Sequence, residues 1–381
     1  MPHSRNLSVS SFCSTLSMDP DNSLAFFEND NYSTDELVKE AHGIVKKHQQ
    51  RLSQAAPQKL KSYDLAKLLA ALLDHAPNPL GARYVAVALH VAAANNDSGH
   101  SVVEAAKAWL DQLVLPMLRI ALEKRSEPSS SHWTPTLDQT AQVIKSADRK
   151  EQREFRTALA KRERYRCAIT NAFDRDRVEY FDELGRSHEI PPGPVHKMAA
   201  AHIIPSFLTS FDDAEGHKAT IRDAASTWDL LQSWTQTDLR GLIGGKSVSP
   251  PNGIYMTRDD HEDFGAFRFY LDKMAFPNDA NKYRAVCLRS RLSTGDRSSI
   301  VNFNDEDPPN PEYLRIHAAF AQVLHLSGAA EYLEHLRSDA ERMVMLHSDG
   351  KADFGEALAS QLAVLGGSGF DYVSDSDVGF V

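Results

Sequence analysis

Three polar residues interrupt apolar stretches of the sequence, and their types suit chemistry at a bound metal ion. His202 lies within the run AAHIIP at 200–205, which predicts a short buried strand. Asn252 follows two prolines and precedes Gly253, a turn signal that puts it at the start of a second strand. His261 follows Asn252 by nine positions, on the helix expected after that strand. These side chains can together hold one divalent metal beside one water molecule.

The reaction best suited to this set is hydrolysis of a phosphodiester. Water must lose a proton, negative charge must be neutralised at phosphorus, and the leaving oxygen must be stabilised. One divalent metal can do the last two, and a neutral imidazole, with its usual pKa of about 6.5, can accept the proton at neutral pH. A strand would hold His202 more rigidly than a loop. The Asn252 amide has two candidate partners, the backbone of His202 or a water molecule on the metal.

Short strands and one helix are predicted to position these residues. The helix follows the second strand directly, so it can fold back onto the strand pair and bring His261 to its mouth. The apolar pattern places strands at 198–204, 253–256, 267–271 and 283–288, and opens the helix at 259–264.

The first third of the chain predicts helices without a catalytic set of residues. Ser33 and Glu36 have the spacing of a capping box, and so do Ser101 and Glu104. This part is expected to be a structural or interaction bundle. Its helices are predicted to begin at Ser33, to span 63–73 and 80–94, and to run from 101 to 116.

Four pieces of the sequence follow one another in an order known from a nuclease family. They are RCAIT at 166–170, AAHIIP at 200–205, NGI at 252–254, and His261 with Phe264 three positions later. In this order they resemble the HNH endonucleases with the ββα-metal fold, and more narrowly the HNH-like domains common in fungal proteins.

The resemblance covers roughly residues 160 to 275, and the segment 311–328 is similar to what often follows this domain. It implies His202 as general base, Asn252 as the residue that orients the loop and the base, and His261 as a metal ligand, with Asn252 as a further ligand. The implied cofactor is a divalent metal, foremost Mg²⁺, with Mn²⁺, Ni²⁺ or Zn²⁺ as alternatives. The implied substrate is nucleic acid, with DNA favoured over RNA.

Two positions depart from the family pattern and lead to a second hypothesis. Many HNH enzymes have an aspartate or histidine metal ligand just before the catalytic histidine, where this chain has Ala201, and an aspartate is usual where it has Gly265. Hard cations prefer oxygen ligands, so both losses weaken the site. The acids Asp259, Asp260 or Asp263 are candidates to substitute. The alternative is an inactive HNH-fold binding or scaffold protein.

A cation-rich helix is predicted before the HNH-like segment, although the whole chain carries a formal net charge of -10. Nucleic-acid binders are usually basic, so contact would need a local basic surface. Glutamates interleave with the cations, so i,i+4 pairing on a solvated face explains much of the pattern. The candidate phosphate-contacting residues are Arg149, Arg153, Arg156, Arg164 and Arg166.

The sequence therefore predicts an α+β protein with an HNH-like ββα-metal core, additional short strands, and helical regions on both sides. Trp228 and Trp234 are expected in the core of an insertion rather than as base-stacking platforms. Three scattered cysteines and the lack of a long apolar run favour an intracellular protein, nuclear or cytoplasmic, without membrane contact. The predicted boundaries are a disordered tail at 1–30, helices at 31–127, a linker at 128–136, the HNH-like domain with its basic helix at 137–290, helices at 308–347 and a disordered tail at 366–381.

Overall fold

The computed structural model describes most of the chain between residues 32 and 331. The described residues are 32–56, 63–94, 99–117, 150–176, 194–204, 227, 229–239, 242, 248–273, 276–288, 300–303 and 307–331. Helices and short strands are mixed there, as expected for an α+β protein. No helix in these ranges is long and apolar enough to cross a bilayer. Outside them lie both predicted tails, the linker at 128–136, the basic segment 137–149 with Arg149, Trp228, and residues 332–347.

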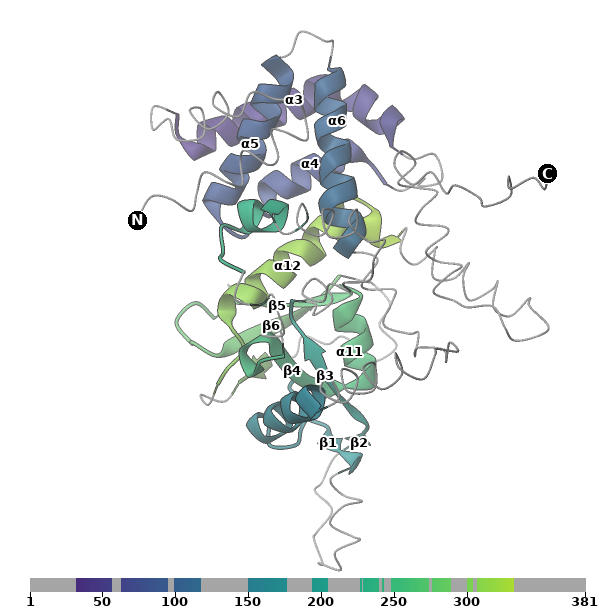
Figure 1. Cartoon of the computed structure of the whole chain (residues 1–381), viewed down its shortest axis with the longest axis vertical. Helices are drawn as coiled ribbons and strands as arrows, with labels where there is room; N and C mark the ends of the chain where they lie inside the picture. Colours follow the sequence, from purple (N-terminus) through teal and green to yellow (C-terminus); the bar gives the residue numbers. More distant parts are fainter. Residues whose placement is uncertain are drawn as a thin grey trace, which may run out of the picture.

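Helices dominate the N-terminal part of the described structure (Figure 1). They are α3 (Thr34–Ala55), α4 (Leu65–Asp74), α5 (Pro79–Ala94) and α6 (His100–Trp109), the last continued by the π-helical turn η1 (Leu110–Val114).

The two predicted capping boxes had different outcomes. The first is present, because the Ser33 side chain accepts a hydrogen bond from Glu36 N and the Glu36 carboxylate accepts one from Ser33 N, both at 3.2 Å. The second is wrong. The N-cap of α6 is Gly99, which has a left-handed φ of 93° and makes no side-chain cap bond. Glu104 pairs instead with Lys107 at 2.9 Å. A glycine meets this backbone requirement without the steric cost of a Cβ atom.

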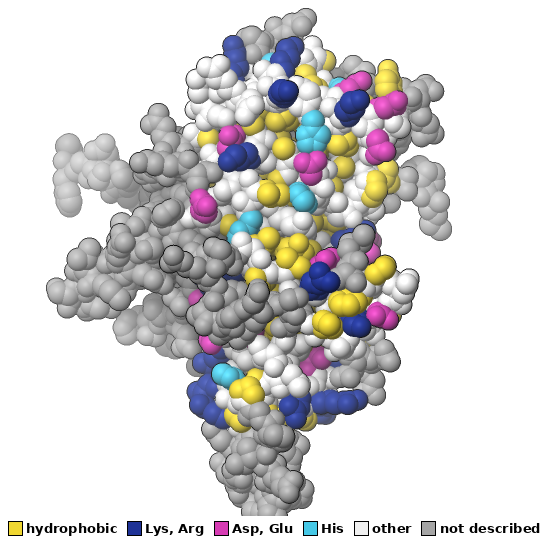
Figure 2. Space-filling view, turned by 180° about the vertical axis from the view of Figure 1, so that it is seen from behind, with side chains coloured by type: hydrophobic (Ala, Val, Ile, Leu, Met, Phe, Trp, Pro, Cys, Tyr) yellow, Lys and Arg dark blue, Asp and Glu magenta, His cyan; other side chains and the backbone are white. Residues whose placement is uncertain are grey.

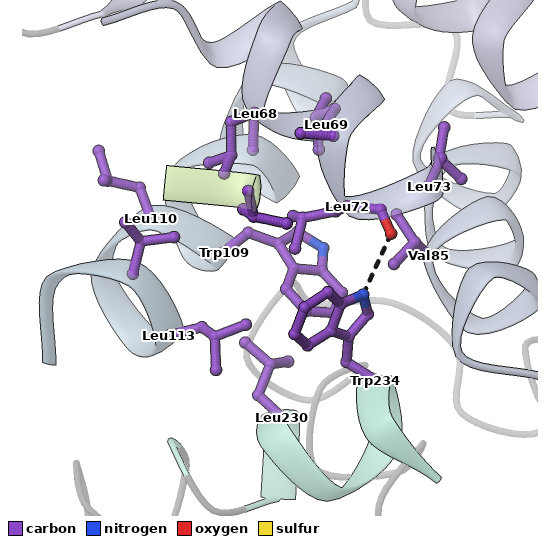
Figure 3. Packing of buried hydrophobic residues seen from close by; sticks show 14 of the residues in the cluster. Leu68, Leu69, Leu72, Leu73, Val85, Trp109, Leu110, Leu113, Leu230 and Trp234 are labelled. Carbon is purple, nitrogen blue, oxygen red and sulfur yellow. Dashed lines mark hydrogen bonds between the residues drawn. The ribbon is translucent and has the colours of Figure 1, made fainter. Parts of the chain in front are cut away.

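The N-terminal helices share their hydrophobic core with segments from far along the chain. Trp234, on the short helix 229–235, is fully buried, and its Nε1 donates to the Leu72 carbonyl at 3.1 Å (Figure 3). A Cβ atom on Gly81 would lie 1.8 Å from the Trp234 carbonyl oxygen, so the close approach of the two helices requires this glycine. Trp234 is therefore a core residue, as predicted, but the core is shared with the N-terminal helices.

The described strands form three small sheets. β3 (Met198–His202) pairs antiparallel with β4 (Gly253–Thr257), close to the predicted positions. The other two sheets are a parallel pair, β1 (Phe173–Asp174) with β2 (Val195–His196), and an antiparallel sheet of β5 (Phe269–Asp272), β6 (Lys282–Cys287) and β7 (Ile300–Asn302). The sequence did not predict β1, β2 or β7.

Two helices pack against the β3–β4 pair. α11 (Arg258–Gly265) begins directly after β4 and packs against β3. The helix at 150–162 contributes Phe155 and Leu159 to the same hydrophobic cluster as Ile254 of β4. The strand pair is therefore packed against both helices.

α12 (Pro311–Leu326) runs between the helical part and the strands (Figure 1). Its His317 ring stacks on Phe264 of α11 with centroids 3.8 Å apart, and His317 Nε2 donates to the Phe264 carbonyl at 3.1 Å. His325 Nε2 donates to the Phe267 carbonyl at 3.1 Å. α12 thus joins the N-terminal core to the C-terminal end of α11.

Candidate functional site

His202 is the last residue of β3, and its register partner is Gly253, the first residue of β4. Its half-buried ring stacks on Phe155 with centroids 4.7 Å apart and an interplanar angle of 23°. Phe155 belongs to the helix at 150–162, so this helix sets the plane of the imidazole.

Gly253 allows the helix at 150–162 to approach the strand pair at this point. A Cβ atom on Gly253 would lie 2.4 Å from Phe155 Cζ and 2.7 Å from Leu159 Cδ1. The contacted ring is the one that stacks on His202, so a larger residue at 253 would displace the support of the imidazole.

Asn252 binds the chain immediately after His202. Its Oδ1 accepts from Ile204 N at 2.8 Å, and its Nδ2 donates to the Ile204 carbonyl at 2.9 Å. Its own carbonyl accepts from Ile203 N at 3.0 Å. The side chain is fully buried and both amide atoms are used. This geometry favours the predicted positioning role of Asn252 over its role as a metal ligand, and the backbone partner is Ile204 rather than His202.

A buried arginine, Arg162, holds the backbone on both sides of Asn252, and the sequence did not single it out. Arg162 donates to the carbonyls of Pro250 at 2.9 Å, Gly253 at 2.7 Å and Asp307 at 2.9 Å. Its Nε donates to the Glu163 carboxylate at 2.8 Å, and burial raises the pKa of Glu163 although Arg162 opposes this shift. This set of contacts, the Arg162 network, holds the residues on both sides of Asn252. In the sequence, Arg162 looks like any other cation of its helix.

The RCAIT segment is linked to the start of α11. The Cys167 thiol donates to Asp260 Oδ2 at 3.2 Å, and Thr257 Oγ1 donates to the same oxygen at 2.6 Å. Asp260 N donates to Thr257 Oγ1 at 3.1 Å and so caps the helix. Burial, and secondly the charge of Asp260, raise the pKa of the Cys167 thiol to about 11. Cys167 is therefore a neutral donor to Asp260, and we call these contacts the Asp260 network.

His261 lies on α11 between two anchored residues. Asp260 before it is buried in the Asp260 network, and Phe264 after it is buried beneath His317 of α12. His261 itself is half-buried. The helix that carries it packs against the strand that carries His202, so the structure brings both histidines into one unit of two strands and a helix.

The acids that could replace the missing ligands are mostly engaged elsewhere. Asp260 accepts from Cys167 and Thr257, and Asp263 pairs with Arg268 at 2.7 Å. Asp259 is exposed in the first turn of α11. Within the described ranges, no group of three His, Cys, Asp or Glu side chains is arranged to hold a metal ion. Of the three candidate acids, Asp260 and Asp263 are thus held in other contacts.

The arginines proposed for phosphate contact have different environments. Arg153 and Arg164 are exposed. Arg156 donates to Asp176 at 2.8 Å, and Arg166 lies over the Phe173 ring at 5.4 Å. Arg149 lies outside the described residues.

A buried tyrosine connects the strand pair to β1. The Tyr255 hydroxyl donates to the buried Asp174 carboxylate in a short hydrogen bond. Burial, and secondly this bond, raise the pKa of Tyr255. The contact fixes the β1–β2 pair beside β4. No sequence pattern pointed to it, because the two residues are far apart in the chain.

Comparison with known proteins adds no relative. No family model, no curated protein and no solved structure matches this chain.

Proposed function

We propose that this protein is a metal-dependent HNH-type nuclease that hydrolyses nucleic-acid phosphodiester bonds, with β3, β4 and α11 as its ββα-metal core. The observation that carries the proposal is the pair of hydrogen bonds between the Asn252 amide and the backbone of Ile204. They hold the end of β3 after His202 to the start of β4. The helix with the second histidine follows directly. The burial of Asn252 is compensated because both of its amide atoms are hydrogen-bonded, and these bonds fix the position of the chain next to His202.

In this proposal His202 accepts the proton of the attacking water. Its ring is oriented by the stack on Phe155. The chain after it is held by the hydrogen bonds between the Asn252 amide and the backbone of Ile204, two residues after His202. Asn252 is a positioning residue, because its amide is used by Ile204. The Arg162 network has the same role, since it holds the carbonyls of Pro250 and Gly253 around Asn252.

The metal would be held by His261 and by oxygen atoms of water and of the substrate phosphate. When bound, such an ion neutralises charge at phosphorus and stabilises the leaving oxygen. Mg²⁺ commonly keeps several water ligands and binds substrate phosphates, which is compatible with a site to which the protein contributes few groups. Ala201 and Gly265 offer no side-chain ligand.

Nicking of supercoiled plasmid DNA tests the proposal. Purified protein is incubated with Mg²⁺, Mn²⁺ or Ni²⁺ beside a His202→Ala variant and a control, His100→Ala, which removes an exposed histidine at the start of α6. We expect nicking by the wild type and by His100→Ala, and loss of at least about 100-fold in His202→Ala, the usual contribution of a general base. Equal nicking by all three proteins, or by none, rules the proposal out.

The alternative is a binding or scaffold protein that kept the fold and lost the metal. The engagement of Asp260 and Asp263 in other contacts favours it. Titration calorimetry with Mn²⁺ separates the two, because a nuclease should show a site that His261→Ala abolishes and His100→Ala leaves intact. Gly265→Asp should raise the metal affinity if the rest of the site is present, since it adds a carboxylate one helical turn after His261.

A further inference from the structure

A cluster of cations lies at the end of the β3–β4 pair opposite His202. β1 and β2 are parallel neighbours there, with Asp174 opposite His196. Lys197 follows β2 directly, and its carbonyl accepts from Arg258 N at 3.1 Å. The chain therefore brings cations from three separate segments to one end of the strand pair.

The charges at this end are close enough to influence one another. Asp176 accepts a hydrogen bond from Arg156 at 2.8 Å, and this bond is the main cause of its lowered pKa. The positive charges of Arg175 and Lys197 lower it further. One carboxylate thus lies among several cations, and the pair with Arg156 leaves positive charge in excess.

Three of the cations are solvent-exposed: Arg175, Lys197 and Arg258. Arg258 is the first residue of α11, where the helix dipole disfavours a positive charge. The presence of Arg258 at this position is therefore not explained by a contribution to helix stability. We call these three residues the basic surface.

Two of the three segments that form the basic surface carry an excess of positive charge, although the chain as a whole is acidic. Residues 150–176 and 194–204 contain nine Lys and Arg against five Asp and Glu, whereas the whole chain has 42 against 52. The third segment, α11, contributes Arg258 and four acids: Asp259, Asp260, Glu262 and Asp263. Figure 2 shows Lys and Arg side chains gathered at the lower end of the molecule, the end at which Figure 1 places β1 and β2. Such a local excess concentrates polyanions without making the whole protein basic.

We propose that the basic surface binds the phosphate backbone of duplex nucleic acid, and this rests on the proposed nuclease function. The position of the basic surface relative to His202 determines which part of the duplex it contacts. Lys197 lies five residues before His202, about 16 Å along the extended chain. Phosphates of one strand rise by about 3.4 Å along a duplex, so the contacted phosphates lie roughly five nucleotides from the bond at His202.

The type of side chain present favours duplex backbone over unpaired bases. Single-stranded binding relies on exposed aromatic rings on which bases stack. The large exposed hydrophobic residues of the described structure are Tyr32, Leu80, Ile300 and Leu326, none of which belongs to the segments that form the basic surface. The ring of Phe173, two residues before Arg175, lies under the Arg166 guanidinium at 5.4 Å. Contacts of this kind position a duplex without reading its sequence.

The experiment measures binding of the full chain to a fluorescent 20-base-pair DNA by anisotropy, in EDTA to prevent cleavage, over a series of salt concentrations. The surface variant combines Arg175→Gln, Lys197→Gln and Arg258→Gln. The matched control removes the same charge from α3, with Lys39→Gln, Lys46→Gln and Lys47→Gln, all exposed. Phosphatidylserine vesicles serve as a second anionic probe.

We expect the surface variant to reduce the slope of log affinity against log salt by roughly 2.7, about 0.9 for each lost phosphate contact. The control should keep the wild-type slope. An unchanged slope in the surface variant, an equal loss in the control, or binding to vesicles without binding to the duplex overturns the proposal. Plasmid nicking is read separately. If the wild type nicks plasmid but the surface variant keeps the wild-type salt slope, only the proposal for the basic surface is wrong. If the surface variant loses salt-dependent binding but the wild type does not nick, only the nuclease proposal is wrong.

Discussion

The helical part and the strand pair are built on different kinds of buried residue. Among the described residues from 32 to 117, Arg83 is the only buried polar side chain outside the aromatic residues, and the rest of the core is apolar. Around β3, β4 and α11, six polar side chains other than histidine are buried: Arg162, Glu163, Asp174, Asn252, Thr257 and Asp260. Burying such groups costs free energy unless each finds a partner. The apolar core stabilises the fold, whereas the buried polar groups fix the positions of particular loops.

This contrast suggests where the molecule tolerates change. Apolar cores accept swaps that conserve volume, because packing is adaptable. Buried hydrogen-bonded groups do not, because loss of one partner leaves the other without solvation. If the polar networks serve a site, substitutions in them should disturb His202 and its loop more than substitutions of equal size in the helical core.

The largest effect is expected for Arg162→Met. It removes bonds to three carbonyls and leaves the Glu163 carboxylate buried beside an apolar chain. Breaking a buried pair in this way costs about 3 to 5 kcal/mol in the free energy of unfolding. Lys161→Met removes an exposed cation next to it and should stay within about 0.5 kcal/mol. Urea unfolding gives both values, and a loss below 1 kcal/mol for Arg162→Met would contradict the importance of the network.

The second prediction compares two substitutions that roughly conserve side-chain volume, one in the loop at Asn252 and one in the helical core. Asn252→Leu removes both partners of the Ile204 backbone and should cost about 2 to 4 kcal/mol, since each buried unsatisfied group costs about 1 to 3. Leu72→Met in the helical core should cost less than about 1.5 kcal/mol. Similar losses for the two variants would mean that the polar loop is no more specific than the apolar core.

The third effect depends on pH. The pKa of Cys167 is raised from 9.0 to about 11, so the folded protein holds this proton more tightly than the unfolded chain. The resulting stabilisation is present below pH 9 and is lost as the pH rises from 9 to 11. Its size is about 3 kcal/mol.

Cys167→Ser keeps a donor for Asp260 but does not titrate in this range, so its stability should fall less steeply above pH 9 than that of the wild type. Cys287→Ser, on β6, should keep the wild-type slope. Parallel slopes for the wild type and Cys167→Ser would show that the thiol does not titrate as described.

The smallest effect is expected at Gly253. Gly253→Ala should displace the Phe155 ring and cost about 1 to 3 kcal/mol, because the close-packed contact leaves no room for a methyl group. Combining it with Phe155→Leu should recover part of the loss in a double-mutant cycle. Additive losses would show that the two residues do not compete for the same space.

The sequence predicted the elements that have strong local signals. The capping box at Ser33 and the apolar run around His202 led to the correct helix and strand, and the order of the strand pair and α11 was correct. Local patterns also put Trp234 in a core. These signals operate over a few residues, which is the range that a pattern can report.

Features that depend on distant contacts were not visible. β1 and β2 have two residues each, too few for any periodicity, and their pairing crosses a long stretch of chain. Arg162 differs from its neighbouring cations only in what it contacts. The bond between Trp234 and Leu72 joins parts of the sequence that were predicted as separate regions. The role of Cys167 depends on an aspartate near the start of α11 and could not be read from the RCAIT segment alone.

The most direct test is a crystal structure of the full chain soaked with Zn²⁺, which imidazole binds well, examined by anomalous scattering. The proposed nuclease site, which joins His202 and His261, predicts one peak about 2.1 Å from a ring nitrogen of His261, with the His202 imidazole facing the same cavity. A peak elsewhere, or the two rings on opposite sides of the strand pair, would contradict it.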